Sequence, residues 1–168
     1  MKKILTYPNK ALSTDWTDPQ WSISEGELGN ASLHMLVDCL IDEMYMRKAV
    51  GFAANQIGEP ADIFVLDVDG DPLVVINPVV RCLGEVIEME EACLSLPGVS
   101  AKVPRSKYVR LIYHTMDYEL RTDFFEGIQA QAIQHEVDHL TGKLYWDHLS
   151  SMKRDMLKRK YTKIHKYK

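Results

Sequence analysis

The spacing of apolar residues between positions 30 and 47 predicts an amphipathic helix. One stripe at helical intervals is apolar and consists of Leu33, Leu36, Val37, Leu40, Ile41 and Met44. The opposite side of the segment carries His34, Asp38 and Asp42. An apolar stripe with polar residues opposite is typical of a helix that packs one face against a core.

Five segments after this helix have the composition of β-strands. Each is short, rich in β-branched or aromatic residues, and bounded by turn residues such as Asp69-Gly70-Asp71-Pro72 or Asn77-Pro78. They span residues 63–68, 73–76, 79–87, 108–114 and 119–125. Short connections favour antiparallel pairing, so the pattern predicts an α+β fold with mostly antiparallel sheets.

A second helix is expected where the strands end. Its apolar stripe follows the i, i+4, i+7, i+11 spacing of Ile128, Ala132, His135 and His139. Asp123 and Glu126 have the spacing of a capping box at its start, and Gly142 is placed for a left-handed cap at its end. The sequence therefore predicts a central helix, packed by the sheets, with two histidines on its apolar face.

His135, Glu136 and His139 form the pattern H-E-x-x-H on this helix. Because residues four apart lie on one face, both imidazoles can point to a single metal ion, and Glu136 can reach a metal-activated water as a general base. The pattern arises by chance in roughly one chain in a hundred of this length. The alternative is an amphipathic helix with two solvated or capped histidines.

A catalytic metal site needs three protein ligands and one open position, so one ligand remains to be found. The extended zinc-protease pattern would put a third histidine at the position of Tyr145, and His148 comes three residues too late. No glutamate follows Glu136 in the sequence. The third ligand must therefore come from an upstream segment.

Among the three cysteines, Cys93 is the best candidate for that ligand. Cys39 lies in the apolar run of the first helix and is expected in the core, whereas Cys82 lies in a strand segment with no motif around it. Cys93 lies in the turn-rich residues 91–98, and a loop can bring a thiol to a helix face. An isolated cysteine is more often a small buried hydrophobe, and this alternative stays open.

Length and composition indicate a single domain over residues 1–168 and no membrane segment. The chain is 46% hydrophobic and 26% charged, which is typical of globular proteins. No apolar run approaches the roughly 18 residues that span a membrane, and no secretory signal is visible. An odd number of cysteines favours reduced thiols, so we expect a cytoplasmic protein.

Positive charge is concentrated at the C-terminal end. Residues 149–168 hold eight Lys or Arg and one acid, for a charge of +7, while the other residues hold 12 basic and 23 acidic groups, for −11. We expect a basic helix here with Leu149, Met152 and Met156 on its apolar side. It is either a solvated helix or an arm that binds RNA or the ribosome through phosphates, without sequence specificity.

Three segments together resemble the peptide deformylase family, which carries G-x-G-L-A-A-x-Q, E-G-C-L-S and H-E-x-D-H in this order. Here they are Ala-Val-Gly-Phe-Ala-Ala-Asn-Gln at residues 49–56, Glu-Ala-Cys-Leu-Ser at residues 91–95 and His-Glu-Val-Asp-His at residues 135–139. The start of the chain and residues 103–105 are also similar to the family. The resemblance thus runs from about residue 3 to about residue 150.

Three positions depart from the family pattern. Ala49 and Ala92 stand where the family has glycine, and Phe52 stands where it usually has leucine. A glycine at position 92 could adopt a positive φ or allow a close approach, so alanine could change the rim of the pocket. Every proposed chemical residue is retained, so the departures bear on rate and substrate shape more than on reaction type.

The resemblance implies a metal-dependent hydrolase that removes the formyl group from nascent polypeptides beginning with formyl-methionine. It implies that Cys93, His135 and His139 bind one divalent ion, Fe²⁺ in most members, with Zn²⁺, Ni²⁺ or Co²⁺ as the other candidates. Glu136 would be the general base.

The resemblance also implies the remaining roles in the site. The Gln56 amide and the Leu94 backbone N–H would stabilise the oxyanion, and Gly51 would align the substrate backbone. The methionine pocket would be lined by Val50, Ile128 and Ala132. The partners would be formyl-methionyl peptides and, through the basic helix, the ribosome.

Two other functions fit parts of the sequence. A zinc endopeptidase could use the same H-E-x-x-H helix, although Tyr145 and the lack of a later glutamate count against it. A non-catalytic ribosome- or RNA-binding protein could hold a structural metal. Such a site would want a fourth protein ligand and would leave Gln56 and Glu136 unexplained.

Overall fold

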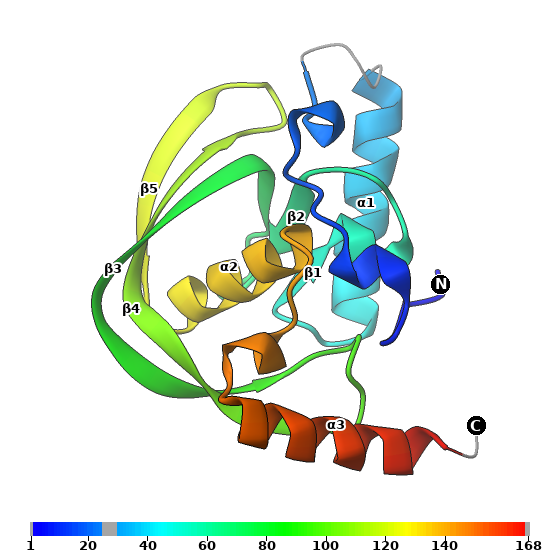
Figure 1. Cartoon of the computed structure of the whole chain (residues 1–168). Helices are drawn as coiled ribbons and strands as arrows, with labels where there is room; N and C mark the ends of the chain where they lie inside the picture. Colours follow the sequence, from blue (N-terminus) through cyan, green and yellow to red (C-terminus); the bar gives the residue numbers. More distant parts are fainter. Residues whose placement is uncertain (1, 25–29, 167–168) are drawn as a thin grey trace.

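The sheet of this protein is antiparallel throughout, as the strand pattern predicts. The computed structural model describes residues 2–24 and 30–166, and Figure 1 shows their arrangement. Five strands pair in the order β1-β2-β3-β4-β5, so each strand lies beside the next one in the chain. Their bounds are β1 (Gly51–Ala53), β2 (Ile63–Leu66), β3 (Leu73–Ala92), β4 (Ser100–His114) and β5 (Leu120–Glu126).

Strand β3 differs from the prediction because it is one strand of 20 residues. The sequence predicts two strands parted by a turn at Asn77-Pro78, but here the pairing with β4 only shifts register between Ile76 and Val79. Asn77 lies at this register shift and has φ 50°. Its side chain accepts from the Ile23 N–H at 3.0 Å and donates to the Ile23 carbonyl at 2.9 Å. The polar pair therefore forms a bulge held by the N-terminal segment, and the strand continues through it.

Helix α1 (Asn30–Met46) forms where the apolar stripe predicts it. The innermost residues of the stripe, which are at most 4% exposed, are Leu33, Val37, Leu40 and Met44. They pack with Phe52 and Ile63 in one buried cluster, with Ala49 at its edge. The large Phe52 side chain is thus a core residue, and the departure from leucine at this position fills space against α1.

Helix α2 (Gly127–Leu140) is the central helix of the fold. Figure 1 shows β3, β4 and β5 curving around it. Its buried residues Ala130, Ile133 and Leu140 share a cluster with Val109 and Leu111 of β4. Burying this face on the sheet holds the motif residues in a fixed place.

The two ends of α2 meet the predictions differently. The predicted capping box is wrong, because Asp123 and Glu126 belong to β5, and Asp123 instead accepts a hydrogen bond of 2.9 Å from Tyr113. The predicted C-terminal cap is confirmed, since Gly142 has φ 72° and its N–H donates to the His139 carbonyl at 3.2 Å. A side chain at position 142 would also meet the Ser13 backbone at 2.8 Å.

Helix α3 (Ser151–His165) carries the basic residues and is packed on the body of the protein. The predicted apolar side is wrong for Met152 and Met156, which are 73% and 64% exposed. Tyr161 is 5% exposed instead, and its hydroxyl donates to the Tyr7 carbonyl at 2.9 Å. Its ring meets Tyr7 and Trp146 edge-on, each at 5.9 Å between centroids. The Tyr161 ring thus packs against the rings of Tyr7 and Trp146, and this contact sets the rotation of α3 about its axis. In the described part of the chain, no helix has the length and apolar character to cross a membrane.

Candidate metal centre

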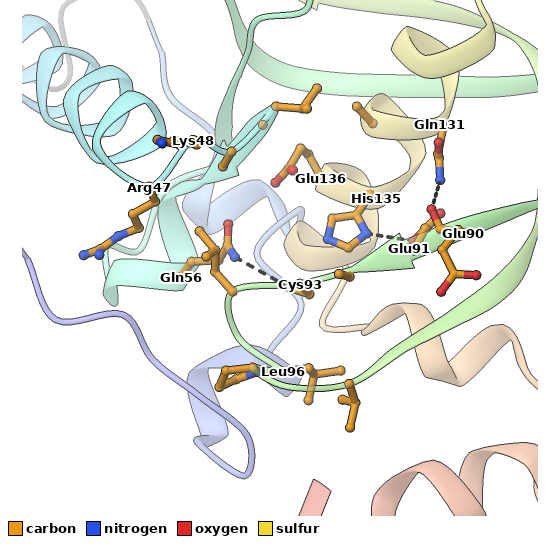
Figure 2. Close-up of a pocket in the computed structure, with 18 of the residues that line it drawn as sticks. Arg47, Lys48, Gln56, Glu90, Glu91, Cys93, Leu96, Gln131, His135 and Glu136 are labelled. Atoms are coloured by element: carbon orange, nitrogen blue, oxygen red, sulfur yellow. Dashed lines mark hydrogen bonds and ion pairs between the residues drawn. The ribbon is translucent and has the colours of Figure 1, made fainter. Parts of the chain in front are cut away.

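A cavity of about 520 Å³ lies between β1 and the short helix η3 (Ala54–Ile57), the loop that follows β3, and α2. Figure 2 shows Gln56, Cys93, His135 and Glu136 converging on it from these elements. Every site residue predicted from the sequence lines this cavity except His139, which is 1% exposed behind Cys93. The fold therefore brings the three sequence segments together around one space.

Cys93, His135 and His139 are the group of described residues that could hold a metal ion. One ligand atom from each lies within 4.8 Å of the other two, and the Cys93 Sγ is 3.1 Å from the His139 Nε2. Tetrahedral coordination with ordinary metal–sulfur and metal–nitrogen bonds separates such atoms by about 3.5 Å. A thiolate and two imidazoles suit borderline transition metals, so the residues present fit a divalent ion.

The electrostatics of this group favour a thiolate. Burial alone would raise the pKa of Cys93, but His139 and His135 beside it outweigh burial and hold the pKa of the thiol well below its usual value. The Ser95 N–H donates to the Cys93 Sγ at 3.4 Å, and a turn from Leu96 N to the Cys93 carbonyl fixes the loop. Thiolate is the form that ligates a metal.

His135 is oriented by a buried ion-pair network that the sequence analysis did not predict. Its Nδ1 donates to the Glu91 carboxylate at 2.8 Å, as Figure 2 shows. Arg105, 3% exposed, binds Glu91 through two bonds of 2.6 and 3.0 Å and Asp138 through one of 2.7 Å. Burial would raise the pKa of Glu91, but Arg105 and His135 lower it to about 2. Glu91 therefore stays ionised and leaves the Nε2 of His135 free to ligate.

Glu136 has the environment of a proton acceptor. It is 4% exposed, and its Oε2 has no hydrogen-bond partner among the described residues. Burial raises its pKa to about 7, although His135 and His139 oppose the rise. A carboxylate poised near neutral pH and directed into a cavity can take a proton from water and return it. Gly51 lies against this side chain, since a Cβ there would sit 2.6 Å from Oε1.

Two residues that line the cavity, Gln56 and Leu94, carry N–H donors. The Gln56 Oε1 accepts from the Ala53 N–H at 2.9 Å, which turns the Nε2 toward the Ser95 Oγ at 3.3 Å and the Cys93 Sγ at 3.9 Å. Leu94 lines the cavity, and its backbone N–H makes no hydrogen bond within the described residues. Both donors can therefore serve a developing oxyanion.

The walls of the cavity are apolar on one side and charged at the rim. Val50, Ile128 and Ala132, which the resemblance assigns to the methionine pocket, line the cavity. Residues that the sequence analysis did not single out also line it, namely Arg47, Lys48, Glu90, Gln131 and the loop residues 96–99. Ala92 pairs with Ser100 and does not have a positive φ, so alanine fits its backbone without strain.

The remaining candidates take other positions. Tyr145 is buried and its hydroxyl donates to the Val99 carbonyl at 3.0 Å, while His148 contacts Asp138 at 2.7 Å. Neither Tyr145 nor His148 belongs to the metal-capable group, in agreement with the prediction that the third ligand comes from an upstream segment. Cys39, which was expected in the core, is only half-buried. Cys82 is exposed on β3.

Comparison with known proteins gives one consistent result. Residues 1–155 match the family model described as polypeptide deformylase. A peptide deformylase of Rhodopseudomonas palustris is 36% identical over 174 residues, covering 99% of this chain and 95% of the relative. The crystal structure of a Legionella pneumophila peptide deformylase superposes with a TM-score of 0.86 at 32% identity, covering 99% of this chain and 96% of the other. A Met-Ala-Ser-bound class I type b peptide deformylase of Acinetobacter baumannii gives 0.82 at 26% identity, covering 89% and 98%.

Proposed function

The chain belongs to the polypeptide deformylase family, and from this membership we propose which of its residues carry out the reaction. The family removes the N-terminal formyl group from nascent peptides by hydrolysis, and the chain is an enzyme of this kind. The observation that carries the residue assignment is the Cys93–His135–His139 group with the unpartnered carboxylate of Glu136 beside it.

Cys93, His135 and His139 would hold the divalent metal, with Glu91 keeping His135 in the ligating tautomer. An ion bound there supplies Lewis-acid chemistry and makes hydroxide available near neutral pH. We propose Fe²⁺ as the native ion, with Zn²⁺, Ni²⁺ and Co²⁺ as ions that the same thiolate and imidazole donors accept.

Glu136 acts as the general base and then as the general acid. Its Oε2 would accept the proton of the attacking water and later deliver it to the leaving amine. The pKa of about 7 lets the carboxylate do both near neutral pH. The Gln56 amide and the Leu94 N–H would donate to the oxyanion, and losing one such donor costs about 3 kcal/mol of barrier.

The substrate is a peptide that begins with formyl-methionine. Gly51 would align its backbone beside Glu136, and the methionine side chain would lie against Val50, Ile128 and Ala132. The relative from A. baumannii was solved with Met-Ala-Ser bound, a peptide with the expected first residue. A cavity of about 520 Å³ has the size of a typical small-ligand site.

We further propose that the chain works as one cytoplasmic catalytic domain whose α3 meets the ribosome. A groove of about 400 Å³ between β4 and α3 is lined by Lys102, Lys153 and Lys160. None of these lysines forms an ion pair with another residue that the structure describes. Unpaired lysines supply phosphate affinity that weakens with salt. A Lys153→Glu/Lys160→Glu variant should sediment less with ribosomes at low salt than the parent protein, while Lys10→Glu should sediment normally. If the parent protein and both variants sediment equally, α3 is a solvated helix that does not bind ribosomes.

One assay tests the residue assignment and the rival functions together. Formate release from a formyl-methionyl peptide is measured beside cleavage of the same peptide without the formyl group. We expect formate release only, and we expect Glu136→Gln to abolish it while the metal content stays the same. Cleavage of the internal peptide bond would indicate an endopeptidase, and near-normal formate release by Glu136→Gln would remove Glu136 from the mechanism.

A further inference from the structure

His148 lies at the outer end of a row of charged side chains that leads to His135. Its Nε2 is 2.7 Å from the Asp138 Oδ2, and the Arg105 Nη1 is also 2.7 Å from that oxygen. The side chain of His148 is 31% exposed, whereas that of Arg105 is 3% exposed. The row therefore runs from the surface to the interior beside the metal centre.

The direction of each hydrogen bond in the row follows from the donors available. A guanidinium only donates, so Arg105 donates to Asp138 and also to both oxygens of Glu91, at 2.6 and 3.0 Å. The Asp138 Oδ2, a carboxylate oxygen that only accepts, lies 2.7 Å from the His148 Nε2, so Nε2 carries a proton and donates to it. The Arg105 Nη1 also lies 3.3 Å from this nitrogen, but with the proton on Nε2 that approach is not a hydrogen bond. At the inner end, Glu91 accepts from the His135 Nδ1 at 2.8 Å.

The balance of charge shows what His148 adds. Asp138 and Glu91 are two buried carboxylates that share a single guanidinium, and a buried carboxylate needs hydrogen-bond donors to remain ionised. Without His148, Asp138 would depend on Arg105 alone, and Arg105 would be drawn away from Glu91.

The position of His148 does not depend on this contact. It ends the short helix η4 (Tyr145–His148), in which the Leu144 N–H donates to the Asp147 Oδ2 at 3.0 Å. Tyr145 and Trp146 in the same turn are each 1% exposed. The backbone is thus anchored by its neighbours, and the His148 side chain can be changed with the turn in place.

We propose that His148 is a positioning residue of the metal centre. By donating to Asp138 it holds Arg105 on Glu91, and Glu91 then fixes the ring of His135 with Nε2 toward the metal. This inference rests on the proposed metal site and extends it by three hydrogen-bonded side chains. Side chains outside the ligand set commonly change metal affinity or activity by about 10- to 100-fold.

The test compares His148→Leu, His148→Gln and Asp147→Asn with the parent protein. Leucine removes the donor, glutamine keeps an N–H donor at nearly the same place, and Asp147→Asn perturbs the same turn without touching Asp138. Each protein is loaded with Co²⁺, and its visible spectrum and the rate of Co²⁺ transfer to a chelator are recorded. kcat and KM for a formyl-methionyl peptide are then measured.

We expect His148→Leu to release Co²⁺ about tenfold faster, to shift the cobalt spectrum, and to lower kcat with little change in KM. His148→Gln and Asp147→Asn should stay within about twofold of the parent. Parent-like release and spectrum for His148→Leu, or equal defects in His148→Leu and His148→Gln, would overturn the role of His148. If the parent binds no stoichiometric Co²⁺, or Cys93→Ala binds it equally well, the metal site itself is wrong and this inference falls with it.

Discussion

Replacing Gly51 with alanine should damage catalysis through Glu136. An alanine Cβ at this position would lie 2.6 Å from the Oε1, 2.9 Å from the Cγ and 3.0 Å from the Cδ of Glu136. Non-bonded heavy atoms prefer a separation of about 3.5 Å or more, so the carboxylate must move by roughly 1 Å. Gly51 lies in β1 and does not have a positive φ, so the backbone itself accepts alanine.

The size of the effect follows from the role of the displaced group. A displacement of roughly 1 Å can cost about 100-fold, and general base catalysis contributes about 10²- to 10⁴-fold in total. We therefore expect kcat to fall by about 10²- to 10³-fold, or roughly 3–4 kcal/mol of barrier. Overpacking should also cost about 1–3 kcal/mol of folding stability. Metal content should not change, because Glu136 is not one of the proposed ligands.

A double-mutant cycle decides whether the methyl group acts through Glu136. Formate release is measured for the parent, Gly51→Ala, Glu136→Gln and the double variant, each at equal metal content. If the reasoning is right, Gly51→Ala has little further effect once Glu136→Gln has removed the base. Additive losses, a change confined to KM, or loss of metal in Gly51→Ala would each refute it.

Three further predictions concern separate parts of the molecule. Cys93→Ala should lose bound metal and activity together, whereas Cys82→Ala should keep both; unchanged metal in Cys93→Ala, measured by elemental analysis, would exclude it as a ligand. Burial and the charge of Asp15 raise the pKa of Asp62 from 3.8 to about 7, so the folded state loses stability as the pH rises from about 4 through 7. Asp62→Asn should remove this loss of folding stability, which is about 4 kcal/mol above pH 8. The free energy of unfolding in urea is measured for both proteins at pH 5 and pH 8, and a difference between them that is the same at both pH values would contradict the prediction. Tyr161→Phe should lower the free energy of unfolding by about 1 kcal/mol without changing kcat, and parent-like stability would show that the bond to Tyr7 contributes nothing.

The sequence predicts the metal-capable residues well because their spacing is itself geometric. On a helix, positions four apart must lie on one face, so His135 and His139 are adjacent whatever the rest of the fold does. Cys93 could be placed only by comparing segments, since no helical period links it to α2. Its position depends on a loop that begins where β3 ends.

The parts that could not be predicted depend on contacts between distant segments. Asn77-Pro78 is typical of a turn, but here the Asn77 side chain bonds to Ile23 and its backbone N–H donates to the Asp62 carbonyl, and β3 continues through it. Arg105 stands in a strand next to apolar residues, and nothing local shows that its partners are Glu91 and Asp138. A buried ion pair between segments leaves no periodic signal, so the network around His135 is visible only in three dimensions.

Helix α3 shows how charge and packing can occupy different faces of one segment. Lys153, Lys160 and Lys163 are exposed, whereas Lys158 lies over the rings of Tyr7 and Trp146. Tyr161 binds Tyr7, whose N–H in turn donates to the Ser95 carbonyl at 3.0 Å. Ile164 lies against Gly98, with its Cδ1 only 3.5 Å from where a Cβ would be. The helix therefore supports residues 95–99, which include part of the cavity wall. Deleting the helix would remove this support together with the positive charge. Only charge-reversing substitutions on the outer face can therefore test the proposed ribosome binding separately from catalysis.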